Sequence, residues 1–148
     1  MISPERLRKQ PHCAGAPDDL LRKVAMLTAE RPFRKGEILF EEGGRATHLL
    51  FLEAGEVNIA FTLGSGNEVT VDTLVAGEVL AWSALLEPHV LTARGVGRSD
   101  GMCLAVEAEG LRQLCAENPA YGYLMMTQVA KTLRDRLTAT RVQLAAAH

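Results

Sequence analysis

The chain has 148 residues, of which 47% are hydrophobic and 23% charged, and its formal net charge at pH 7 is −2. Such a length and composition are typical of one globular domain and argue against a second domain or a disordered chain. The slightly acidic balance argues against a DNA-binding surface, and no apolar run approaches the roughly 18 residues of a membrane span, so we expect a cytoplasmic protein that contacts neither DNA nor membrane.

The N-terminal segment shows no apolar period and combines prolines and a glycine with several charges. Residues 1–16 are therefore predicted to be a flexible or loosely docked arm, and residues 17–148 a single domain. Asp18 provides a helix start ahead of apolar residues at helical spacing. This helix is expected to end near Thr28 to Arg31, because Pro32 disfavours helical geometry in the residue before it.

The middle of the chain is predicted to be all-β. From Phe33 onward the apolar period changes from about 3.6 to about 2 residues, and glycines recur at intervals near the 8 to 12 residues expected of a sandwich or barrel. We expect a roll over about residues 32–107 and helices over about 107–146. The predicted strands are 37–40, 48–52, 57–61, 69–74, 90–97 and 101–106.

One stretch, Gly77 to Gly97, interrupts the strands with a short apolar turn of helix. The turn is Trp82 to Leu86, and Pro88 closes it. The first turn of a helix has free backbone N–H groups, and such an end suits an anionic ligand. We therefore treat this stretch as the candidate site.

The last segment is predicted to be one long helix with a packing seam. Its part near Tyr123 to Val129 is expected to contact the core. The distal half has more apolar seam than a lone helix needs, which predicts a homodimer contact between two such helices. The alternative is a helix that folds back on its own roll. The seam comprises Tyr123, Met126, Ala130, Leu133, Leu137, Thr140 and Leu144.

Potential metal ligands and reactive thiols are scattered. None of the cysteines forms a C-x-x-C pair; Cys103 and Cys115 are interpreted as core residues and Cys13 as an exposed thiol. The histidines show no H-x-H spacing, so no metal site is expected and an enzyme of the cupin type, with a metal in a β-barrel, is disfavoured. These histidines are His12, His48, His89 and His148.

Four sequence motifs stand out between the predicted elements. They are Arg34-Lys35-Gly36-Glu37-x-Leu39-x-x-Glu42-Gly43, Leu50-Phe51-Leu52-x-x-Gly55-x-Val57, Gly77-Glu78 and Ala84-Leu85-Leu86. With these motifs the chain resembles the cyclic nucleotide-binding domain family from about Leu20 to the C-terminus. The resemblance implies a mainly β fold with flanking helices: a double-stranded β-helix, or jelly roll, with an inserted cassette helix at 81–87, an N-terminal helix and two C-terminal helices.

In that family the cassette helix offers backbone amides to the cyclic phosphate, a Glu holds the ribose and an Arg pairs with the phosphate. Here Ala81 stands at the position of the cassette's second Gly, Trp82 at that of the Glu, and His89 follows the proline where the resemblance implies an Arg. A desolvated anion without its Arg partner loses several kcal/mol of binding. Cyclic AMP binding in the family's usual manner is therefore not expected.

Alternative contacts remain open for a nucleotide or another small anionic ligand. Arg94 either points into the pocket from the next strand or lies outside it. His89 either binds phosphate when protonated or is a surface loop residue. Trp82 either stacks on a planar ligand or fills the space of the ribose, and Ser83 supplies a hydroxyl or a plain cap. With Gly77, Glu78 and Ala81 these residues form the predicted ligand-binding set.

The resemblance implies a regulatory sensor rather than an enzyme. A ligand in the roll would shift the cassette and reorient the C-terminal helices in a dimer. Relatives that regulate transcription append a helix-turn-helix after the long helix; the chain stops at His148 without one, so we expect it to act through a partner protein or to have stopped signalling. The alternative is a structural or interaction module with an occluded pocket, which Trp82 favours.

Overall fold

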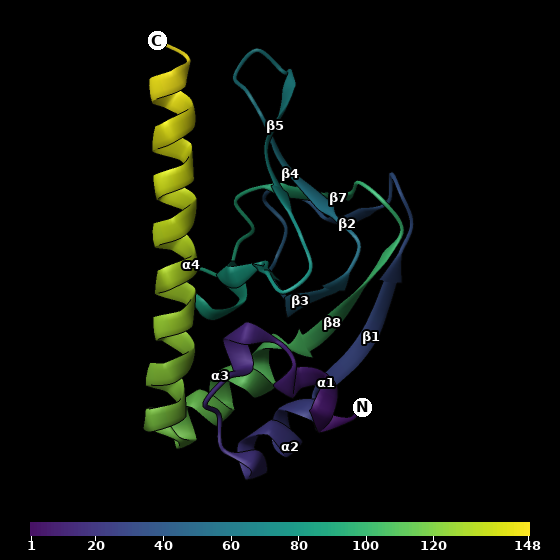
Figure 1. The fold of residues 1–148 in the computed structure, drawn as a ribbon, viewed down its shortest axis with the longest axis vertical. Helices are drawn as coiled ribbons and strands as arrows, with labels where there is room; N and C mark the ends of the chain where they lie inside the picture. The colour runs from purple at the N-terminus through teal and green to yellow at the C-terminus, as the bar shows by residue number, and fades with distance from the viewer.

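The computed structural model describes residues 1–148, and it confirms a mainly β fold with flanking helices (Figure 1). The chain begins with two short helical segments and a longer helix, continues with eight strands, and ends with two helices. In order, the elements are α1 (Pro4–Arg8), η1 (Pro11–Cys13), α2 (Asp18–Met26), β1 (Thr28–Phe33), β2 (Ile38–Phe40), β3 (His48–Ala54), β4 (Val57–Thr62), β5 (Glu68–Leu74), β6 (Val79–Leu80), η2 (Trp82–Leu85), β7 (Arg94–Gly97), β8 (Gly101–Glu107), α3 (Ala108–Glu117) and α4 (Pro119–Ala146).

The strands form two four-stranded antiparallel sheets that face one another as a jelly roll. The strand orders are β1-β8-β3-β6 and β2-β7-β4-β5. Within the first sheet Leu50 lies opposite Ala105 and Leu52 opposite Cys103, so the same faces of β3 and β8 point into the roll. The residues buried between the sheets are Phe33, Leu39, Leu50, Leu52, Val57, Leu74, Leu80, Cys103 and Ala105.

Gly55 lies in the turn from β3 to β4, at a position that only glycine can occupy. Its φ is +87°, and a Cβ there would lie 2.5 Å from the carbonyl oxygen of Asp100. Any side chain would clash with this backbone, and L-residues rarely adopt that φ. The turn therefore requires glycine.

Residues 1–16, predicted to be a flexible or loosely docked arm, are docked, and part of the segment is buried rather than loosely held. Leu7 is fully buried, and Cys13, expected to be exposed, is also buried, so burial raises the pKa of its thiol to about 12. Arg6 joins Glu53 at 2.6 Å and Glu30 at 2.8 Å. These partners are far away in sequence, and α1 is too short to show an apolar period, so local patterns missed it.

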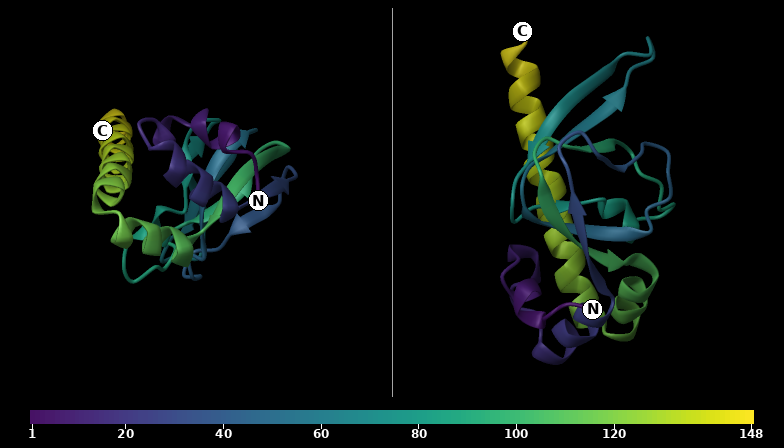
Figure 2. Two further views of the ribbon diagram at one scale, coloured as in Figure 1. Left: turned by 90° about the horizontal axis from the view of Figure 1, so that it is seen from below. Right: turned by 90° about the vertical axis from the view of Figure 1, so that its right-hand side faces the viewer.

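Helix α2 ends earlier than predicted, because Thr28 already pairs with Val106 as the first residue of β1. Its hydroxyl donates a hydrogen bond to the Val24 carbonyl at 2.6 Å, which satisfies a carbonyl in the last turn of the helix. The roll therefore starts before residue 32. Figure 2 shows α1, α2 and α3 gathered at one end of the roll.

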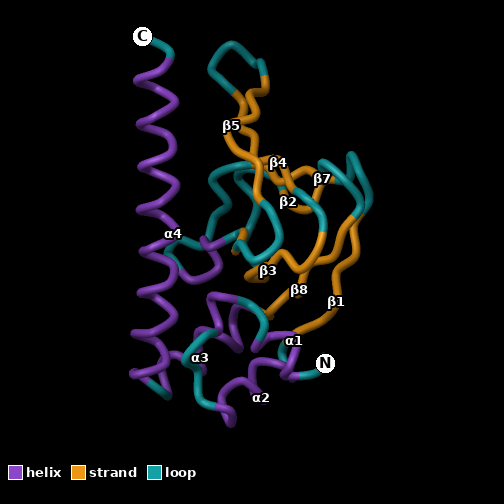
Figure 3. The backbone as a smooth tube through the Cα atoms, viewed as in Figure 1, coloured by secondary structure: helices purple, strands orange, loops and turns teal.

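Helix α4 runs along one side of the roll, and its C-terminal end lies at about the level of the tip of the β4–β5 hairpin (Figures 1 and 3). The residues that it buries against the rest of the molecule are Tyr121, Met125 and Val129. Tyr123, predicted to contact the core, is 78% exposed, because it lies on a different face of the helix. No helix of the chain is both long and apolar enough to cross a membrane.

Candidate functional site

The predicted cassette helix is a single 3-10 turn, η2, which is shorter than residues 81–87. It closes through a hydrogen bond from the Ala84 N–H to the Ala81 carbonyl at 3.0 Å. Ala81 has a φ of 59° and so keeps the left-handed backbone expected of a glycine. A left-handed alanine costs about 1–2 kcal/mol, which the surrounding packing must offset. The backbone turn of a cassette is thus retained without its glycine.

The cavity at this turn is very small. Its volume is about 30 Å³, enough for one or two waters at about 10–15 Å³ each but far below the about 300–1,000 Å³ of small-molecule sites. No charged side chain lines this cavity, and most of its lining is apolar. The lining residues are Phe40, Ile59, Leu80, Ala81, Trp82, Ser83, Leu91, Thr92 and Ala93. Of the predicted ligand-binding set, only Ala81, Trp82 and Ser83 come together here.

Arg94 lies outside the small cavity, so the inward orientation considered for it is not what the structure shows. It forms ion pairs with Glu41 at 2.6 Å and with Glu68 at 2.8 Å. Along β7 the buried positions are Gly95 and Gly97, so the alternation of the strand places the Arg94 side chain on the outer face. The cassette therefore has no arginine for a phosphate.

His89 is neither a free surface residue nor a cavity ligand. Its Nδ1 lies 3.0 Å from the Ser83 carbonyl oxygen, and since a carbonyl only accepts, Nδ1 donates. The residue has a φ of 60° and its backbone N–H bonds the Leu86 carbonyl at 2.8 Å. The imidazole thus ties the end of the cassette loop back to its 3-10 turn.

Gly77 and Glu78 position the cassette rather than line its cavity. The Gly77 N–H donates to the Leu52 carbonyl at 2.8 Å, with a φ of +94°. The Glu78 carboxylate accepts from the Val75 N–H at 2.7 Å and pairs with Arg136 of α4. Glu78 is therefore a link between the cassette and the C-terminal helix.

Two arginines attach the cassette to the C-terminal helices. Arg112 of α3 donates to the Ala84 carbonyl at 2.7 Å, and Arg136 of α4 contacts both Glu78 and Asp72, the latter at 2.6 Å. Sequence reasoning missed both arginines, because their partners lie 28 and 58 residues away. No local pattern reports such contacts.

A half-buried histidine makes a further attachment of α4. The Nε2 of His12 lies 2.9 Å from the Thr132 hydroxyl, and burial lowers the pKa of this imidazole below its ordinary value. His12 also stands beside Phe51 of β3, with ring centroids 6.4 Å apart. The neutral ring therefore joins the N-terminal segment, the roll and α4.

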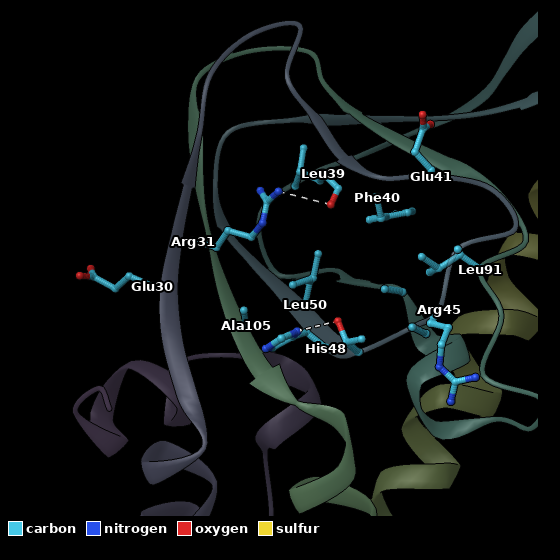
Figure 4. A pocket seen from close by; sticks show the side chains of 14 residues that line it. Glu30, Arg31, Leu39, Phe40, Glu41, Arg45, His48, Leu50, Leu91 and Ala105 are labelled. Atoms are coloured by element: carbon cyan, nitrogen blue, oxygen red, sulfur yellow. Dashed lines mark hydrogen bonds between the residues drawn. The ribbon is translucent and has the colours of Figure 1, made fainter.

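A second, larger cavity lies in the same roll (Figure 4). Its volume is about 420 Å³, within the range of small-molecule sites. It opens between β1, β2, β3 and β8, and it shares Phe40, Ala81 and Leu91 with the small cavity. The remaining lining residues are Glu30, Arg31, Leu39, Glu41, Gly44, Arg45, Ala46, Thr47, His48, Leu50 and Ala105. No group of three or more His, Cys, Asp or Glu side chains is placed to hold a metal ion.

The sequence profile of the family described as "Cyclic nucleotide-binding domain" matches residues 30–118. The chain belongs to the cyclic nucleotide-binding domain family. The resemblance seen in the sequence is thereby confirmed, and the matched range contains both cavities and α3. The coarse role that comes with the family is that of a regulatory domain.

Solved structures agree with this family assignment. A protein of Geobacter metallireducens GS-15, described as a cyclic nucleotide-binding protein, is 30% identical with a TM-score of 0.83, covering 93% of this chain and 99% of its own. A cyclic nucleotide-binding domain from Methylobacillus flagellatus KT is 17% identical with a TM-score of 0.81, covering 97% and 81%. The catabolite activator protein of Thermus thermophilus is 23% identical with a TM-score of 0.72, covering 93% of this chain and 62% of its own. The latter two likenesses show the fold alone.

Proposed function

We propose that this cyclic nucleotide-binding domain is a regulatory sensor that does not bind cyclic nucleotides through its cassette, and that it signals through a homodimer formed by α4. The observation that carries the first part is the cassette cavity of about 30 Å³ without a charged side chain. A cyclic phosphate placed there would lose its water without gaining a cationic partner. The cassette therefore serves as a mechanical element rather than as a ligand cradle.

The contacts between the cassette and the C-terminal helices support its role as a relay. Arg112 holds the Ala84 carbonyl inside η2, while Arg136 holds Glu78 at the entrance to β6. A displacement of η2 would stretch the hydrogen bond between Arg112 and the Ala84 carbonyl and so move α3, which packs against α4. Coupling of this kind needs contiguous contacts between two elements that can move, and these bonds provide them.

The outer face of α4 supports the homodimer. The helix buries Tyr121, Met125 and Val129 against its own domain, whereas seam residues Met126, Leu137 and Leu144 are 39%, 50% and 61% exposed. The seam therefore lies on a different face from the one that meets the roll. Exposed apolar residues at steps of three and four along a helix are the pattern of a helix–helix interface.

Calorimetry with cyclic AMP and cyclic GMP tests the first part of the proposal. We expect no heat of binding at concentrations that saturate ordinary cyclic nucleotide sites. Micromolar binding that is lost in Ser83→Ala would contradict it, because that loss would place the nucleotide at the cassette. The control is Thr62→Ala, an exposed hydroxyl outside both cavities.

Sedimentation at high micromolar concentration tests the dimer. We expect a dimer that Leu137→Asp converts to a monomer, because a charge in the seam would be buried against its own copy. Thr138→Asp adds the same charge one residue away on an exposed position off the seam, and it should leave the dimer intact. A wild-type monomer would overturn this part of the proposal.

A second candidate function is a structural or interaction module that responds to no ligand. Trp82 favours it, because its indole lines the small cavity and occupies the position where the family resemblance implies a ribose-binding Glu. This candidate and the sensor share the α4 dimer. They differ in whether the larger cavity takes a ligand.

A further inference from the structure

The larger cavity is built like a small-molecule site with an apolar interior. Its inner wall is made by Leu39 of β2, Leu50 of β3 and Ala105 of β8, all buried, and by Phe40 and Leu91 beside them. In Figure 4 these side chains surround the open space between the two sheets. An apolar body placed there would be removed from water at about 25 cal/mol per Å² of its surface.

The charged groups at the rim are unequal in their availability. Both acidic lining residues pair with arginines outside the cavity: Glu30 with Arg6 at 2.8 Å, and Glu41 with Arg94 at 2.6 Å. Figure 4 shows their carboxylates directed away from the cavity. The ionisable side chains left to contact a ligand inside the cavity are therefore the other ones in its lining.

Those side chains are Arg31, Arg45 and His48. Arg31 extends from β1 toward Leu39, whose carbonyl oxygen lies 3.3 Å from Nη2, and it has only a long contact of 3.5 Å with Glu37. Arg45, on the other side of the cavity near Leu91, makes no ion pair. The Nδ1 of His48 is hydrogen-bonded to the Thr47 hydroxyl at 2.9 Å. Arg31 is thus a weakly paired guanidinium beside the cavity wall, whereas Figure 4 shows the Arg45 guanidinium directed away from the cavity.

We propose that the larger cavity binds a monocarboxylate with an apolar aliphatic body, with its carboxylate on Arg31 and its chain against Leu39, Leu50 and Ala105. The Arg31 guanidinium already contacts a carboxylate oxygen and a carbonyl oxygen, and its planar fork matches a carboxylate in a bidentate manner. The polar side chains lie at the rim, whereas the inner wall of Leu39, Leu50 and Ala105 is apolar, so a ligand with one charged end and an apolar body fits this division.

This inference deepens the proposed function by naming the ligand class of the sensor, and it rests on that proposal only for the signal that follows binding. Ala81 and Leu91 line both cavities, so a ligand in the larger one touches the residues that flank the cassette turn. A ligand in the larger cavity would therefore displace η2 and change the hydrogen bond that Arg112 donates to it.

The test uses the full chain and decanoate, below its micelle-forming concentration, in titration calorimetry. We expect binding of decanoate and none of acetate or inorganic phosphate, which lack the chain, and weaker binding of decanol, which lacks the charge. Arg31→Met should weaken decanoate binding at least about tenfold, and Arg34→Met, an exposed arginine outside the cavity, should leave it unchanged.

A second variant guards against misfolding of Arg31→Met. Arg31→Lys keeps the charge but loses the fork, so it should bind decanoate with intermediate affinity while its circular dichroism matches the wild type. Absence of decanoate binding, or equal binding by wild type and Arg31→Met, would overturn the inference. Failure of the proposed function would be seen in other measurements: as binding of a cyclic nucleotide in calorimetry, or as a monomer in sedimentation.

Discussion

The two cavities of the roll share three lining residues and yet differ in almost every property that decides binding. The cassette cavity holds about 30 Å³ and has no charged lining, whereas its neighbour holds about 420 Å³ and has arginines at its rim. The cassette retains the backbone turn of its family but not the charges, whereas open space and charged side chains occur together in the neighbouring cavity. Family membership therefore establishes the fold, whereas the side chains that line each cavity decide which of them can bind a ligand.

Shortening a side chain in the wall of each cavity should change the free energy of unfolding more than any other substitution considered below. It also tests directly whether the two cavities differ in packing. Leu80 is fully buried at the small cavity, so Leu80→Ala should lower the free energy of unfolding by about 2–5 kcal/mol in urea titrations. Leu39→Ala, at the larger cavity, should lower it by less, because that side chain already borders open space. Equal losses would mean that the two regions are packed alike.

Loss of the bond from α3 to the cassette should have a smaller effect. Arg112→Met leaves the Ala84 carbonyl without its partner, which should lower the free energy of unfolding by about 1–3 kcal/mol. The matched control is Gln113→Met, because the Gln113 amide bonds only the exposed Glu117. If both variants unfold at the same denaturant concentration, the cassette is not held by α3 as described.

The ion pairs of α4 should contribute less again. Arg136→Met removes contacts to Asp72 and Glu78 that are only partly buried, so we expect a loss of about 0.5–1 kcal/mol that shrinks at high salt. Arg134→Met, an exposed arginine on the same helix, should change stability by less than about 0.5 kcal/mol. A loss that does not depend on salt would point to packing rather than charge.

The pH dependence of stability gives the smallest and most local test. Burial lowers the pKa of His12 in the folded chain, so the unfolded chain binds the proton more readily. Stability should therefore be fully present above the unfolded pKa of about 6.5 and should decrease as the pH falls through and below it. His12→Gln should flatten this part of the profile in thermal melts. An unchanged slope would show that the imidazole is not responsible.

The residues that sequence reasoning placed at the cassette fall into two groups. Ala81, Trp82 and Ser83 do line one cavity, because they are consecutive and their positions follow from the local turn. Arg94 and His89 could not be placed from the sequence, since their directions depend on the pairing of β7 and on the fold of the cassette loop. Orientation across a sheet is a property of register, which a single strand does not reveal.

The sequence by itself determined the roll and the long helix, because period-2 strands, required glycines such as Gly55 and the heptad seam are local signals. Only the tertiary structure decided that the cassette leaves a cavity of about 30 Å³ and that Arg31, Leu50 and Ala105 meet around a larger one. It also decided that residues 1–16 are docked and that Arg112 and Arg136 hold the cassette. Volume, burial and ion pairs between distant residues arise only when the chain has folded, so no local pattern contains them.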